Sequence, residues 1–347
     1  MDGEPEPEDL PWGVQLSLEG TGPPPGRTKR EGGTGRAARK SGTGWVILRR
    51  SRSALERRFS LWRRLWEKFE VRSGMRCSPL DLRGAGRSME RTEALLVVSF
   101  GTAAEEARQE ELGGVEEALR RRCPGLPFAR AYTSPTIRRI LAKRGTVVPS
   151  LEEALEEQRA AGIGRLYVLT THLLPGYEYD AIAAAAEQFR PRFSDLRLSR
   201  PLLGDTDMVR ALAQVVLDRW PEQPGRTIVL VGHGTAHPGN LVYPALQGMF
   251  RLAGREDVLV GTVEGWPGLE DLLPALRRRG TERVLLVPLL LTAGTHVRED
   301  LAGEEPDSWK SSLERAGYPV EVVLQGLGRL PQVQELYVRR LEQLLEP

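Results

Sequence analysis

Short apolar runs alternate with helical patterns from residue 90 onward. The runs occupy residues 94–100, 166–170, 227–231, 258–263 and 283–291, and segments with helical periodicity lie between them. Runs that are apolar throughout are typical of strands buried on both faces of a parallel sheet. The alternation therefore predicts an α/β fold of doubly wound parallel sheets, in which ligands collect beyond the carboxyl ends of the strands.

The helical segments carry their own signals. Ser150-Leu-Glu-Glu153 is a capping box, which predicts a helix that Gly162 can end. Two later segments each place their apolar residues on one helical stripe: Val209, Leu212, Val215 and Val216, and then Val333, Leu336, Leu341 and Leu344.

The two halves of this region resemble each other. Residues 96–102 and 230–235 both end an apolar run with Gly-Thr, and residues 166–176 match 284–294. The simplest interpretation is two similar α/β domains with a cleft between them. We place these domains at 89–210 and 211–347, with the last helix able to pack back on the first domain, because prolines at 201, 221 and 224 flank a helix there.

Residues 1–88 have a different character. They contain 18 Lys and Arg against 11 Asp and Glu, and residues 1–44 are rich in Gly, Pro and charge, which predicts disorder. Residues 45–72 could form a basic amphipathic helix, either an arm for a membrane surface or nucleic acid or an extension outside the fold. We favour the extension, with Met75 or Met89 as the natural start, and expect no nucleic-acid or membrane partner.

Cysteine usage and hydropathy indicate the compartment. Cys77 and Cys123 cannot form a disulfide framework or a CxxC pair, which favours a reducing compartment. No run approaches the ~18 apolar residues of a membrane span, and no secretory signal is evident. We expect a cytoplasmic protein and leave open whether it forms a homo-oligomer.

The four histidines fall in three segments that each follow a predicted strand. His233 lies in Gly-His-Gly directly after residues 228–231, where glycines let a ligand approach the backbone. His237 is four residues later, but the following Pro-Gly argues against a helical metal motif, so we expect at most a supporting role. His172 and His296 complete the set.

Glu264 ends a predicted strand, and His296 follows the run 283–291. With His233 they could converge on one metal ion and leave coordination positions open for a substrate. Each of the three taken alone is more typical of a structural residue, but their shared placement at strand ends favours a site. Residues 35–41 depart from a P-loop and no G-x-S-x-G motif occurs, which argues against nucleotide use and a serine hydrolase.

Residues 94–347 resemble a known family, the ATP-independent (class II) tetrapyrrole chelatases, and within it the anaerobic sirohydrochlorin cobaltochelatases. The resemblance is carried, in family order, by Leu-Leu-Val-Val-Ser-Phe-Gly-Thr102, Arg130-Ala-Tyr-Thr-Ser134, Val-Gly-His233-Gly, Gly261-Thr-Val-Glu264, Ala293-Gly-Thr-His296, Asp307-Ser-Trp-Lys310 and Gly326-Leu-Gly328. Residues 1–88 have no counterpart. The resemblance implies a ferrochelatase-like fold with a tetrapyrrole cleft.

The resemblance also implies roles for particular residues. The metal-binding triad falls on His233, Glu264 and His296, and His233 is also the base that accepts pyrrole protons. The family usually has Asp before the last histidine, where this chain has Thr295. Further candidates for contact with the substrate are Ser99, Thr102, Arg138, Arg139, His172 and Arg298.

The implied reaction is insertion of Co²⁺, as substrate metal, into sirohydrochlorin without ATP or another nucleotide. It requires a base near neutral pH and weak ligands that release the ion. Insertion of iron or nickel into sirohydrochlorin or a porphyrin is the first alternative, because N and O ligands do not separate these metals. A non-catalytic metal or tetrapyrrole carrier and a zinc-dependent hydrolase are alternatives from other classes.

Overall fold

The computed structural model describes residues 92–346 and, for residues 295–297, the backbone alone. These residues all lie in one compact unit of the chain. The predictions for residues 1–88, including the helix at 45–72 and the alternative starts, fall outside the described residues. Within 92–346, no helix has the length and apolar character needed to cross a membrane.

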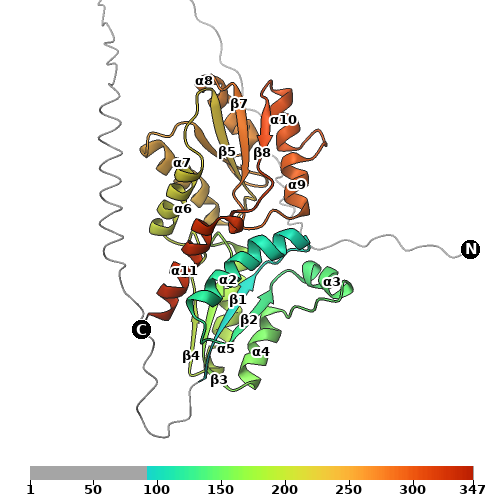
Figure 1. The fold of residues 1–347 in the computed structure, drawn as a ribbon, viewed down its shortest axis with the longest axis vertical. Coiled ribbons are helices and arrows are strands. Elements are labelled where there is room, and N and C mark those ends of the chain that lie inside the picture. The colour runs from blue at the N-terminus through green and yellow to red at the C-terminus, as the bar shows by residue number, and fades with distance from the viewer. Residues whose placement is uncertain (1–91, 347) are drawn as a thin grey trace, which may run out of the picture. The chain divides into compact units, whose positions relative to one another are not determined.

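Two four-stranded parallel sheets form the framework (Figure 1). The first contains β1 (Thr92–Ser99), β2 (Phe128–Tyr132), β3 (Ile163–Thr170) and β4 (Asp195–Leu198) in the order β2-β1-β3-β4. The second contains β5 (Arg226–Gly232), β6 (Val258–Thr262), β7 (Arg283–Pro288) and β8 (Val320–Val322) in the order β6-β5-β7-β8. The order is the same in both halves, and the predicted α/β class with two similar parallel sheets is confirmed.

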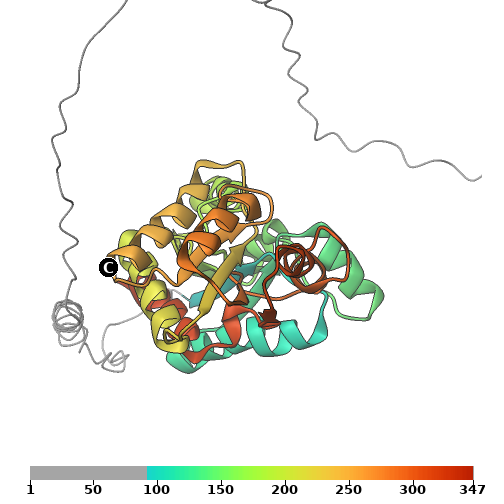
Figure 2. The ribbon, with the colours of Figure 1, turned by 90° about the horizontal axis from the view of Figure 1, so that it is seen from above.

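Helices lie on both sides of each sheet (Figures 1 and 2). The capping box at Ser150 is present and starts α4 as predicted. The first half contains a π-helix η1 (Ala107–Leu112), α2 (Gly113–Arg122), α3 (Pro135–Lys143), α4 (Leu151–Ala160), α5 (Tyr177–Phe189) and η2 (Arg190–Arg192), and α6 (Thr206–Arg219) follows. The second half contains η3 (Pro238–Leu241), α7 (Val242–Leu252), α8 (Leu269–Arg279), α9 (Thr295–Ala302), α10 (Trp309–Arg315), η4 (Leu327–Arg329) and α11 (Pro331–Leu345).

Alternate residues of each central strand serve different hydrophobic layers. In β1, Leu96 and Val98 pack with residues of α4 and α5, whereas Leu95 and Val97 pack with residues of α2, α6 and α11. Successive strand side chains point to opposite faces, so a strand covered on both faces is apolar throughout. Each fully buried Leu or Val contributes about 1.5–3 kcal/mol.

One continuous hydrophobic core connects the two sheets. It includes residues of β1 and β3, of β5 to β7, and of α6 and α11. From α11, the buried Tyr337 hydroxyl donates to the carbonyl oxygen of Thr171 at 2.6 Å, and Arg340 donates to that of Leu202 at 2.9 Å. The last helix thus contacts the loops of the first half, beside α2 and β3. The domain boundary at 210/211 falls inside α6 and stays a prediction.

The strand limits differ from the prediction in two ways. The run 283–291 is a strand only to Pro288, and the strand expected to reach Glu264 ends at Thr262. Three short and incompletely buried strands that contain charged residues, β2, β4 and β8, were not predicted. All three lie at sheet edges, where fewer side chains are buried.

Candidate metal site

His233 directly follows β5 and turns out of the sheet. A Cβ atom on Gly232 would lie 2.2 Å from the ring of Tyr243, and Gly234 has a φ of 85°, a left-handed conformation that favours glycine. The strand therefore packs closely up to its end and the chain then reverses, which leaves the His233 side chain 61% exposed.

Glu264 lies beside His233 because the β5–β6 pairing continues past the end of both strands. The backbone N–H of Val263 donates to the Gly232 carbonyl at 3.0 Å, and that of Glu264 donates to the His233 carbonyl at 2.7 Å. The two side chains project from neighbouring positions, with 3.6 Å between His233 Nδ1 and Glu264 Oε2. Glu264 is 66% exposed, so the pair faces solvent.

The contacts of His233 determine which ring nitrogen is available. Nδ1 lies 3.1 Å from the carbonyl oxygen of Gly234. A carbonyl oxygen only accepts, so Nδ1 carries the hydrogen and Nε2 carries the lone pair. That lone pair can bind a metal ion or accept a proton.

The segment carrying His296 begins on the opposite side of β5. There β7 pairs with β5, and the N–H of Leu289 extends the pairing to the Val231 carbonyl at 2.7 Å. The chain then reaches α9, whose second residue is His296. The loops carrying the predicted triad thus leave adjacent strands at one edge. The side chains that the structure describes form no cluster of three ligands, and His296 is not among them.

His237 connects the two halves of the molecule. Its Nδ1 accepts from the N–H of Gly239 at 2.9 Å, so Nε2 carries the hydrogen and donates to Asp180 of α5 at 3.1 Å. Tyr177 meets the same ring edge-on with 5.0 Å between centroids. Both nitrogens of His237 are engaged in hydrogen bonds, and its supporting role stays a prediction.

Two candidate substrate residues of the first half, the buried Ser99 and the half-buried His172, make contacts within that half. Ser99 accepts from the hydroxyl of Thr171 at 2.8 Å. Nδ1 of His172 lies 2.7 Å from the hydroxyl of Thr170, and its Nε2 is buried with no hydrogen-bond partner. Burial lowers the pKa of His172 to about 4, so this imidazole is neutral at pH 7.

Thr102 and Arg298 lie where the first half meets the loop leading to His296. Thr102 is buried, and a Cβ on Gly294 would lie 3.4 Å from its hydroxyl oxygen. Arg298 donates to Glu106 at 3.2 Å. Hydrogen bonds from Arg298 and Arg329 hold the pKa of Glu106 below its usual value.

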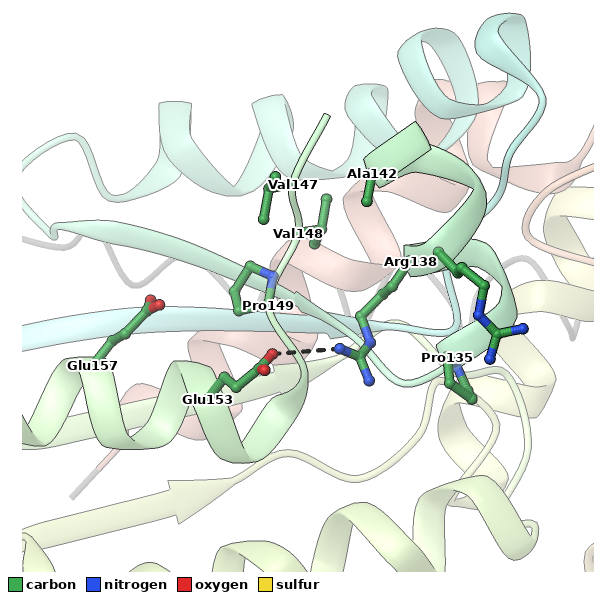
Figure 3. Close-up of a pocket in the computed structure, with 9 residues that line it drawn as sticks. Pro135, Arg138, Ala142, Val147, Val148, Pro149, Glu153 and Glu157 are labelled. Carbon is green, nitrogen blue, oxygen red and sulfur yellow. Dashed lines mark hydrogen bonds and ion pairs between the residues drawn. The ribbon is translucent and has the colours of Figure 1, made fainter. Parts of the chain in front are cut away.

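Arg138 and Arg139 line a groove of about 640 Å³ formed by α3, the following loop and α4 (Figure 3). Arg138 donates to Glu153 at 3.3 Å. Neither His233 nor Glu264 lines this groove. The structure therefore brings the carboxylate and imidazole of the predicted triad together and places these arginines elsewhere.

Three exposed aromatic residues lie in loops that follow strands, and the sequence pattern did not identify them as candidate site residues. Phe100, Tyr177 and Trp266 are 49%, 62% and 60% exposed. Trp266 is linked to the other loops because Asn240 donates to its carbonyl at 2.6 Å. Each aromatic residue adjoins a glycine in the loop that follows a strand, in Phe100-Gly101, Gly176-Tyr177 and Gly265-Trp266, and this pairing could have identified them in the sequence.

The parallel sheets and the exposed imidazole–carboxylate pair describe an α/β protein with a candidate metal site at its strand ends. Its fold is similar to that of SirB from Bacillus subtilis, solved with Fe³⁺, with 17% identity and a TM-score of 0.52 over 73% of this chain and 95% of SirB. The family model "Cobalt chelatase (CbiK)" matches residues 93–346, and the chain belongs to this family. The resemblance inferred from the motifs is confirmed.

Two bacterial relatives are similar over most of the chain. The sirohydrochlorin cobaltochelatase of Salmonella typhimurium strain LT2 is 34% identical over 73% of this chain and 96% of its own length. The sirohydrochlorin cobaltochelatase CbiKC of Nitratidesulfovibrio vulgaris strain Hildenborough is 35% identical over 67% of this chain and 84% of its own.

Proposed function

We propose that this protein is an enzyme that inserts Co²⁺ into sirohydrochlorin. Its family and the names of two relatives support this function. The observation that carries the proposal is the exposed pair of His233 and Glu264 at the ends of neighbouring strands, with Nδ1 and Oε2 at 3.6 Å. It combines a metal ligand, a base and a negative charge at one point.

Metal insertion requires the macrocycle to lose two N–H protons while the ion loses water. The lone pair on His233 Nε2 cannot bind the ion and a proton at once, so it accepts a pyrrole proton when the ion leaves it, and the Glu264 carboxylate beside Nδ1–H stabilises the imidazolium that forms. Because the His233 side chain is largely exposed, it can return each proton to solvent and act again. Nε2 of His233, Glu264 and His296 form the proposed metal site, an open set of ligands that can release the ion.

The macrocycle is proposed to lie against the exposed aromatic residues at the strand ends. Trp266 and Tyr177 offer flat apolar surface beside the loops of His233 and His237. Arg298, in the helix that contains His296, remains our candidate for the substrate carboxylates, whereas Arg138 lines the separate groove. We assign the buried Ser99 and Thr102 and the half-buried His172 to support of the loops at this edge.

We also propose that insertion proceeds without ATP and takes place in the cytoplasm. Likeness to the ATP-independent chelatases supports the first statement, and the low cysteine content supports the second. Cobalt is the proposed metal, with Fe²⁺ and Ni²⁺ as the competitors to be tested.

An anaerobic absorbance assay tests the function directly. Catalytic amounts of protein are mixed with sirohydrochlorin and Co²⁺, Fe²⁺ or Ni²⁺, with and without ATP. We expect many turnovers with Co²⁺ and no effect of ATP. At most one product per protein molecule would indicate a carrier and refute the proposed catalysis. Faster turnover with Fe²⁺ or Ni²⁺ than with Co²⁺ would refute the choice of metal.

Charge-matched variants test the site. Glu264→Gln should weaken Co²⁺ binding in calorimetry while sirohydrochlorin binding stays nearly unchanged. Glu270→Gln removes an exposed carboxylate from the nearby first turn of α8 and should leave both affinities unchanged. Equal Co²⁺ affinity in the two variants would exclude Glu264 from the metal site.

A further inference from the structure

Glu111 is a buried carboxylate at the contact between the two halves. It lies in the π-helix η1 and is 2% exposed. One of its oxygens accepts from the backbone N–H of Ala293 and the other from that of Gly326, both at 2.7 Å. A single side chain of the first half therefore holds two backbone segments of the second.

The first of these segments leads to the proposed metal ligand His296. Ala293 directly precedes Gly294, the N-cap of α9, and His296 is the second residue of that helix. The chain from Ala293 to His296 is therefore short, and a shift of the Ala293 backbone moves the start of α9.

The second segment holds the first from its other side. The N–H groups of Leu327 and Gly328 donate to the carbonyls of Leu290 and Leu291 at 2.8 and 2.9 Å. A Cβ on Gly326 would lie 2.3 Å from the Leu291 oxygen. The loop before α9 thus has little room to move.

Exposed ion pairs surround this buried contact. Glu106, just before η1, accepts from Arg298 of α9 and from Arg329 of η4, both at 3.2 Å. Glu111 of the π-helix and Glu106 just before it therefore connect the first half to the segment leading into α9 and to residues 326–329. π-Helical turns often occur at functional sites, where they place side chains that a regular helix would not.

A carboxylate is a costly group to bury for a merely structural contact. Removing it from water carries a penalty of several kcal/mol, offset here by charge-assisted hydrogen bonds to two N–H groups. Such groups fix one geometry, since any displacement leaves a buried charge without its partners.

We propose that Glu111 is a positioning residue of the metal site, which fixes the backbone before α9 and thereby the place of His296. This inference depends on the proposed role of His296 as a ligand. It also makes the metal site dependent on both halves of the molecule, although its ligands all come from the second.

Paired substitutions of two buried glutamates test the proposal. Glu111→Gln keeps the shape but replaces one acceptor oxygen with an NH₂ group that faces a backbone N–H. Glu116→Gln is the matched control, because Glu116 is equally buried five residues later but binds Arg130 within the first half. The readouts are Co²⁺ affinity by calorimetry, kcat, KM for sirohydrochlorin, and Tm.

Glu111→Gln should weaken Co²⁺ binding by about 10-fold or more, as is typical when support of a ligand is lost, and should lower kcat with little change in KM. Glu116→Gln should lower Tm without changing Co²⁺ affinity. Wild-type Co²⁺ affinity in folded Glu111→Gln, alongside weakened binding in His296→Ala, would overturn the role of Glu111. Unchanged binding in His296→Ala would instead refute the proposed ligand.

Hydrogen exchange of the wild-type protein provides a test that does not depend on the folding of a variant. The amides of Ala293 and Gly326 should exchange as slowly as those of the central strands. Exchange at the rate of an exposed loop would overturn the proposed fixation.

Discussion

Acidification should destabilise this protein through His172. Its Nε2 is buried without a partner, and burial lowers its pKa from 6.5 to about 4. Below pH 6.5 the unfolded chain binds a proton at this residue and the folded chain does not, so the stability that the neutral imidazole contributes is complete above pH 6.5 and is lost as the pH falls towards 4. At about 1.4 kcal/mol per pH unit, the full loss is about 3 kcal/mol.

The assay compares wild type with His172→Asn, which keeps a polar atom near the Thr170 hydroxyl but does not titrate. Urea unfolding of both proteins at pH 7.5 and pH 5 separates His172 from all other titrating groups. The free energy of unfolding of wild type should fall relative to the variant by roughly 2 kcal/mol between these pH values. Parallel pH dependences for the two proteins would refute the reasoning.

Three further outcomes are expected. His233→Ala should lower turnover by about 10²-fold with an unchanged circular dichroism spectrum, since a general base is lost; a rate near wild type would remove His233 from the mechanism. A protein starting at Met89 should fold and keep its turnover, and loss of soluble protein would place essential residues within 1–88. Tyr337→Phe should reduce the free energy of unfolding by about 1–3 kcal/mol, because the buried Thr171 carbonyl loses its donor, and an unchanged urea midpoint would contradict this.

The sequence predicted every central strand, and the strands that it failed to predict lie at sheet edges. β1, β3, β5 and β7 are covered on both faces, and each contains a run of buried, mainly apolar residues that a pattern search detects. The edge strand β6 is also buried along its whole length and was predicted as well. β2, β4 and β8 lie at edges, are only partly buried and contain charged residues. Their burial depends on neighbours that are distant in sequence, so their own residues carry little signal.

The same distinction applies to the site. His233 and Glu264 could be paired in advance, because parallel strand ends meet at one edge and both residues directly follow apolar runs. The burial of His172 depends on tertiary packing, since α11, which lies far along the chain, contacts the loop that carries it. Glu111 was missed because it is one of several glutamates in an acidic helical stretch, and only the folded chain shows that both of its oxygens bind backbone from the other half.

The packing of α11 against the first half has a consequence for biosynthesis. The face of the first sheet that α11 covers consists of residues translated well over a hundred codons earlier. On the ribosome, α2 and α6 can pack on this face early, but the part that α11 covers stays open until residues 331–345 have emerged. A ribosome stalled anywhere between the two halves would display that part of the face to chaperones and to other nascent chains, whereas the released and folded chain does not.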